Sequence, residues 1–122
     1  MSAVAINSQT CPVASRPDAS RPVDLVHLAH QTLGDRALET EILKLFLVQS
    51  ELLMKRLAAG FGDAAVVRRN AHTLKGSASG IGAFEVASDA EALFDAPGDA
   101  VQSDRLGESV ARANAFIRSL LD

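Results

Sequence analysis

Apolar side chains recur along most of this chain at steps of three and four residues, and no run alternates as a strand does. This periodicity predicts helices and no sheet. Five helices are expected: a short one from residue 25 to about 33, a long one over about 35–59, a third over 64–82, a fourth over 83–96, and a last one from about 104 to 120.

Each expected helix carries an apolar stripe that would face a common core. The stripes comprise Leu25, Leu28, Ala29 and Leu33; Leu38, Ile42, Leu45, Phe46, Gln49, Leu52, Leu53 and Leu57; Val67, Ala71, Leu74, Ala78 and Ile81; Val86, Ala87, Ala90, Leu93 and Phe94; and Leu106, Val110, Ala113, Ile117 and Leu120. We therefore predict an all-α fold, an antiparallel four-helix bundle with an additional short N-terminal helix packed at one end.

Local signals mark the expected boundaries. Asp24 follows Pro22 and suits an N-cap, Gly60 to Asp63 separates the second helix from the third, and Pro97-Gly98 stops the fourth. Residues 1–22 are rich in serine and proline and have no helical period, so we expect a flexible tail there. The helical domain is expected over residues 23–122.

Composition narrows the classes of function. A chain of 122 residues with a net charge of −3, no Trp and no Tyr has neither the charge nor the aromatic platforms of a typical nucleic-acid binder. No apolar run is long enough to span a membrane, and the N-terminus does not resemble a signal peptide, so a cytoplasmic location is expected. The single cysteine, Cys11, excludes an intrachain disulfide. His27 and His30 supply at most half of a metal site, and surface histidines are favoured there.

The residues that could take part in a reaction lie on the outward face of the third helix. At about 100° per residue, His72 lies roughly 140° from the centre of the apolar seam and should point to solvent. Four further residues fall within about 60° of His72, and a fifth lies at the edge of that sector. The four are Arg68, Lys75, Gly76 and Ser79, and the fifth is Arg69.

Gly76 is the most informative of these residues. Inside an exposed helix, glycine costs about 1 kcal/mol relative to alanine, yet it stands one turn beyond His72, where a side chain would crowd the imidazole. Lys75 can place its ammonium against an anion attached to the ring. The pattern suits an imidazole nitrogen that attacks phosphorus and then presents the phosphoryl group to a partner. An ordinary solvated histidine is the alternative interpretation of His72 by itself.

The run HTLKGSASGIGA resembles the signature of histidine-containing phosphotransfer (HPt) domains. In that signature, Lys-Gly follows the histidine at the third and fourth positions, and Gly-Ala follows ten and eleven positions later. Here these residues are Lys75, Gly76, Gly82 and Ala83. The segment GDRALETEILKLFLVQSELLMKRL is similar to the long helix that precedes the site in the family. Family members often carry other residues at the positions of Asp89 and Phe94. We expect both positions to lie far from the site and to affect packing only.

The resemblance implies reversible phosphoryl transfer between His72 and an aspartate of a receiver domain. Lys75 would stabilise the phosphoryl group, Gly76 would provide steric clearance, and Arg68, Arg69 and Ser79 would contribute to docking and electrostatics. The chain would be a phosphocarrier, not an enzyme, with no cofactor of its own, because the receiver supplies Mg²⁺. The implied partners are receiver domains of response regulators and of a hybrid histidine kinase, and a monomer is expected.

Two other classes of function compete with this prediction. A module that docks receivers without carrying phosphate would not need the nucleophile that His72 provides. A histidine kinase dimerisation region would carry an acidic residue directly after its histidine, whereas Thr73 follows His72. The chain also lacks a glycine-rich nucleotide loop, so phosphorylation of its own histidine from ATP is not expected.

Overall fold

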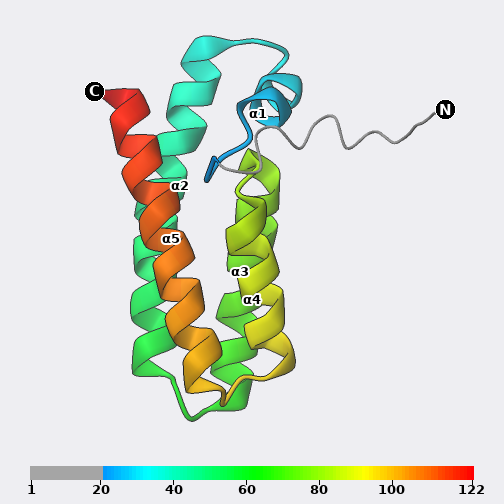
Figure 1. Cartoon of the computed structure of the whole chain (residues 1–122), viewed down its shortest axis with the longest axis vertical. Helices are drawn as coiled ribbons and strands as arrows, with labels where there is room; N and C mark the ends of the chain where they lie inside the picture. Colours follow the sequence, from blue (N-terminus) through cyan, green and yellow to red (C-terminus); the bar gives the residue numbers. More distant parts are fainter. Residues whose placement is uncertain (1–20) are drawn as a thin grey trace, which may run out of the picture.

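A computed structural model describes residues 21–122 of the protein, and every regular element in this range is a helix (Figure 1). The helices are α1 (Leu25–Thr32), α2 (Arg36–Ala59), α3 (Ala64–Ile81), α4 (Phe84–Asp95) and α5 (Ala100–Leu121). The predicted all-α class is confirmed. Most of the predicted tail, including Cys11, lies outside the described residues, whereas Val23, where the domain was expected to begin, is fully buried.

The four longer helices form the bundle, and α1 covers one end of it. α3 packs between α2 and α4, and α5 packs between α4 and α2, so α3 and α5 lie on opposite corners (Figure 1). α1 contacts α2 and α3 at the end of the bundle away from the α2–α3 and α4–α5 connections. This arrangement leaves the outward side of α3 free between its two neighbours.

Aspartate side chains begin four of the five helices. Asp24, Asp35, Asp63 and Asp99 each accept hydrogen bonds from backbone N–H groups in the first turn of α1, α2, α3 and α5. Such caps satisfy donors that have no partner within the helix and stabilise it by about 0.5–2 kcal/mol each. The predicted start of the last helix near Asp104 is wrong by about one turn, because Asp99 caps it and its carboxylate accepts from the N–H of Gln102.

All residues of the predicted apolar seam of α3 are buried, and so are most residues of the predicted seams of α4 and α5. The buried members are Val67, Ala71, Leu74, Ala78 and Ile81 in α3, Val86, Ala87, Ala90 and Leu93 in α4, and Leu106, Val110, Ala113 and Ile117 in α5. Leu120, in the last turn of α5, is 43% exposed and lies outside the core, contrary to its predicted place in the seam. Each seam therefore identifies the inward face, and the error lies at an end.

The predicted face of α2 needs a larger correction. Leu38, Leu45 and Leu52 are 44%, 66% and 45% exposed, although all three were assigned to the core stripe. The side chains that α2 buries are Leu43, Phe46, Ser50, Leu53 and Leu57. Apolar residues lie almost all round this helix, so its own sequence does not single out one face. Packing against α1, α3 and α5 selects the buried face.

The end of α1 also differs from the prediction. Leu33 was placed on the apolar stripe, but it is 93% exposed and adopts φ +55°, the left-handed conformation that terminates the helix. Gly34 follows with φ +79°, and its N–H donates to the carbonyl of Ala29 at 2.9 Å. The helix therefore ends one residue before its expected apolar stripe does.

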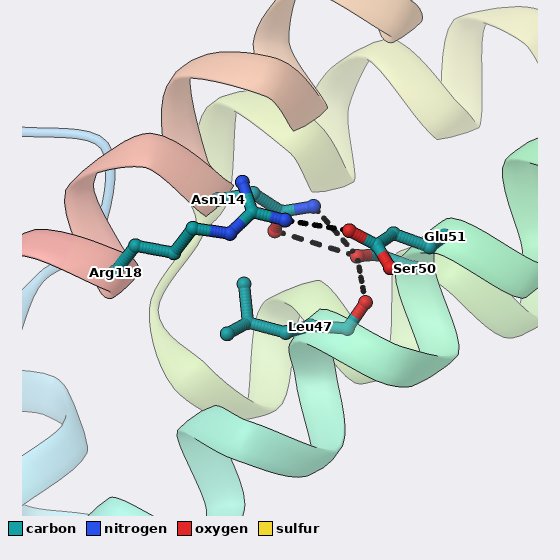
Figure 2. A network of polar contacts seen from close by, with 5 residues as sticks. All are labelled: Leu47, Ser50, Glu51, Asn114 and Arg118. Atoms are coloured by element: carbon teal, nitrogen blue, oxygen red, sulfur yellow. Dashed lines mark hydrogen bonds and ion pairs between the residues drawn. The ribbon is translucent and has the colours of Figure 1, made fainter. Parts of the chain in front are cut away.

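A buried polar pair joins α2 to α5 (Figure 2). Ser50 is fully buried and Asn114 is 5% exposed. Asn114 Nδ2 donates to Ser50 Oγ at 3.0 Å, and that hydroxyl donates to the carbonyl of Leu47 at 3.2 Å. At the exposed edge of this contact between α2 and α5, which we call the α2–α5 seam, Arg118 Nη2 lies 2.6 Å from Glu51 Oε2. The buried pair specifies how α2 and α5 align, because sliding one helix would leave its polar groups without partners.

Gly82 holds the end of α3 against the start of α1. Its φ is +84°, and a Cβ atom there would lie 2.8 Å from the carbonyl oxygen of Asp24. The carbonyl of Gly82 accepts a hydrogen bond from the N–H of Asp24 at 3.0 Å. Both the conformation and the close approach require glycine. In this chain, the Gly82-Ala83 part of the motif therefore serves the fold.

Candidate functional site

His72 lies on the solvent-facing side of α3, a ridge that also carries Arg68, Lys75 and Gly76. Its side chain is exposed, while the seam of α3 is buried on the opposite side of the helix. Within residues 21–122, the imidazole makes no hydrogen bond, and its one ring contact is with Phe94. Both ring nitrogens are therefore free of protein partners. A groove flanks the ridge on each side, one towards α4 and one towards α2.

The groove on the α4 side holds the charged neighbours of His72. It has a volume of about 280 Å³, and its lining comprises Ala71, His72, Lys75, Ala90, Glu91, Phe94 and Asp95. Lys75 Nζ lies 3.5 Å from Glu91 Oε1, and the two side chains are 41% and 58% exposed. An ion pair this exposed contributes only about 0–1 kcal/mol to stability, so Lys75 remains available for another anion.

Phe94 is closer to the site than its position in the sequence suggested. Its ring centroid lies 6.1 Å from that of His72, with a tilt of 53° between the planes, and the side chain is 38% exposed. The expectation that this residue lies far from the site, in the core stripe of α4, is therefore wrong. The antiparallel packing of α4 on α3 brings the C-terminal turn of α4 alongside His72.

Arg68 links the same two helices one turn before His72. Its Nε donates a hydrogen bond of 3.3 Å to the carbonyl of Phe94, at the end of α4 where carbonyl groups lack partners within the helix. Arg68 was predicted to act in docking and electrostatics. In the structure, this contact also anchors the α4 backbone next to the residue that packs against His72.

The groove on the α2 side is largely apolar. Its volume is about 330 Å³, and it lies beside Gly76, Ser77 and Gly80 of α3 and Leu45, Phe46 and Gln49 of α2. A Cβ atom at Gly76 would meet no atom within 4 Å, so packing within this chain does not require glycine there. Exposed Leu45, Val48 and Leu52 of α2 extend the apolar surface. Leu45 and Leu52 were predicted to face the core, so part of the predicted core stripe of α2 forms this surface instead.

The other two residues predicted for the site line neither of the two grooves beside His72. Arg69 is exposed and lines a hollow of about 460 Å³ near the α2–α3 connection, together with Arg56, Gly60 and Asn70. Ser79 is half-buried and sits seven residues beyond His72, about 10 Å along the helix at 1.5 Å per residue. The structure thus brings Lys75, Gly76 and Arg68 around His72, and leaves Ser79 at the other end of the ridge.

The histidines of α1 have a different environment. His30 is exposed, but His27 is half-buried, its ring centroid lies 5.1 Å from that of Phe84, and its Nε2 is buried without a hydrogen-bond partner. His27 is therefore less exposed than the interpretation as a surface residue implies, because its ring packs edge-on against that of Phe84 at the start of α4. The part of the chain that the structure describes contains no cluster of three or more His, Cys, Asp or Glu side chains suited to a metal ion.

A comparison with models of protein families matches residues 41–120 to the Hpt domain. This match covers more than half of the chain and includes His72, the α4-side groove and most of the four-helix bundle. The chain belongs to the Hpt domain family. Searches of curated proteins and of solved structures returned no match. None of the five helices within residues 21–122 combines the length and apolar character that crossing a membrane would require.

Membership of the Hpt family places the chain among proteins that carry phosphoryl groups on histidine in phosphorelays and that interact with receiver domains. Such proteins are phosphocarriers and not kinases. This agrees with the function that the motif around His72 predicted.

Sequence reasoning missed three residues beside His72, all of them on α4. Glu91, Phe94 and Asp95 reach the site only because α4 packs antiparallel to α3. The outward positions of α4 were recognisable as a helical face, but its register against α3 was not. The sequence could have suggested that Lys75 pairs with a carboxylate, but it could not have identified Glu91 as the partner.

Proposed function

We propose that this protein is a phosphorelay intermediate that accepts a phosphoryl group on His72 from a receiver-domain aspartate and passes it to another receiver. The observation that carries the proposal is the exposed imidazole of His72, which makes no hydrogen bond to residues 21–122, on a ridge that is open towards Gly76. A buried ring would offer no approach path to a second protein, and a ring nitrogen that accepted a hydrogen bond would have no free lone pair for attack.

In the proposed step, one ring nitrogen of neutral His72 attacks the phosphorus of the aspartyl phosphate in line with the departing carboxylate oxygen. The new N–P bond forms as the P–O bond breaks, and the electron pair of that bond leaves with the aspartate. The imidazole keeps its proton on the other nitrogen. Mg²⁺ bound by the receiver would offset negative charge on the phosphoryl oxygens, so this chain needs no cofactor of its own.

Two neighbours of His72 support the reaction in different ways. Lys75 Nζ is one turn away and can move from Glu91 towards a phosphoryl oxygen, because its ion pair is exposed and weak. Gly76 leaves the approach to the ring unobstructed. The partners would be receiver domains of response regulators and of a hybrid histidine kinase, bound by a monomer in the cytoplasm.

The test is transfer from a receiver carrying radiolabelled phosphate, performed without ATP, to the parent protein and to His72→Gln. The parent should take up label that is lost in acid and kept in base, as a phosphoimidazole requires. His72→Gln should take up none and should keep its helical circular dichroism spectrum, because the side chain is exposed. Label that moves to His27 or His30 would show the assignment to be wrong. Receiver binding without any labelling of the parent would favour a pure docking module.

A further inference from the structure

Lys75 already has an anionic partner when His72 carries no phosphate. Its Nζ lies 3.5 Å from Glu91 Oε1, and this is its one ion pair within the described residues. Asp95, one turn further along α4, lines the same groove. The groove lining therefore holds one cation and two carboxylates beside His72, which gives it a net negative charge before any phosphoryl group arrives.

A phosphoryl group on His72 would enter this environment with nearly two negative charges of its own. It would attract the ammonium of Lys75, which already forms an ion pair with Glu91, and the carboxylate of Glu91 would repel it. The two anions therefore compete for Lys75, whereas Arg68, one turn before His72, is held by the carbonyl of Phe94. Because both side chains of the ion pair are about half exposed, the competition is moderate in strength and does not prevent phosphorylation.

We propose that Glu91 acts through Lys75 to destabilise phospho-His72, so that the phosphoryl group is readily passed to the next receiver. This inference rests on the proposed function of His72 and adds a positioning residue to it. Glu91 would set the equilibrium between phosphohistidine and aspartyl phosphate without touching the phosphorus. A carrier that held phosphate too firmly would not release it, so a carboxylate opposite Lys75 favours onward transfer.

The same helix offers a matched control. Glu85 lies in the first turn of α4 and forms an ion pair of similar exposure with Arg112, with Oε2 and Nη2 2.9 Å apart. Glu85→Gln removes the same charge and the same type of contact, but about 9 Å along α4 from Glu91, at 1.5 Å per residue. Glutamine keeps the shape of glutamate at both positions. The melting temperatures of both variants should therefore stay close to that of the parent.

The experiment measures how radiolabelled phosphate distributes at equilibrium between this protein and one receiver, without ATP. Glu91→Gln should shift the distribution towards phospho-His72 by about two- to fivefold, the effect expected of an exposed charge pair. Raising the salt concentration should reduce the shift. Glu85→Gln should leave the distribution unchanged. In a Lys75→Gln background, Glu91→Gln should change it by less than about twofold, since exposed charges without a close partner contribute little.

An unchanged equilibrium in Glu91→Gln, or a shift towards the receiver, would overturn this inference while leaving His72 as the carrier. A full-sized shift in the Lys75→Gln background would overturn it too, because Glu91 would then act independently of Lys75. If the parent protein takes up no label at all, the proposed function fails first and this inference fails with it. The labelling of the parent thus separates the two failures.

Discussion

The α2–α5 seam and the outward ridge of α3 use polar side chains in opposite ways. In the seam, Ser50 and Asn114 are buried and hydrogen-bonded to each other (Figure 2). On the ridge, His72 is exposed and has no hydrogen bond among residues 21–122. Satisfied and buried groups hold the bundle in register, whereas an unsatisfied and exposed group remains available for chemistry.

This contrast implies that stability and transfer should respond to different substitutions. Changes on the ridge should alter transfer and leave the free energy of unfolding almost unchanged, since little is buried there. Changes in the seam should do the reverse, because Ser50 and Asn114 lie on helices that do not contribute His72.

Gly76→Gln should slow transfer at least tenfold, because a misplacement of about 1 Å between reacting groups can cost about a hundredfold in rate. Folding should be unaffected or slightly improved, since a side chain at this position enters open space and glycine is a poor helix former. Single-turnover transfer kinetics and thermal melting measure the two effects. Gly76→Ala should stabilise the protein by up to about 1 kcal/mol.

Gly80→Gln is the control for this prediction. Gly80 also has open surroundings on α3, but it lies one helical turn farther from His72. It should slow transfer less than Gly76→Gln. Equal slowing would mean that both residues act through the α2-side groove and not through clearance of the imidazole. Unfolding of Gly76→Gln would contradict the outward geometry of the ridge.

Asn114→Ala should lower the free energy of unfolding by about 1–3 kcal/mol, because it leaves the buried hydroxyl of Ser50 without its partner on α5. Urea denaturation measures the loss. Arg118→Ala, which removes the exposed contact with Glu51 on the same two helices, should cost only about 0–1 kcal/mol. The rate of transfer by folded Asn114→Ala should match that of the parent. A large loss of transfer in fully folded protein would show that seam and ridge are coupled.

Lys75→Ala should produce the smallest change, slowing transfer by about two- to fivefold, as expected for one exposed charge pair. The melting temperature should change little, because the ion pair with Glu91 is exposed at both ends. Rates are best compared at receiver concentrations below saturation and at two salt concentrations. A rate equal to that of the parent at low salt would exclude a role for Lys75 in transfer.

The helices, most of their boundaries and the outward position of His72 follow from the order of the amino acids alone. These properties are local: aspartate caps act within one turn, and the seam of α3 places Leu74 inside and His72 outside by helical geometry alone. The spacing of His72, Lys75 and Gly76 lies within two turns of one helix, and it predicted the family that the match to residues 41–120 confirmed.

Only the tertiary structure decided which side chains from other helices meet His72. The register of α4 against α3 brings Glu91 and Phe94 to the site, and it depends on the packing of whole helix faces. The buried face of α2 was decided in the same way, since apolar residues surround that helix and its contacts with α1, α3 and α5 choose among them. Periodicity specifies the direction of a side chain on its own helix, but not what lies opposite it.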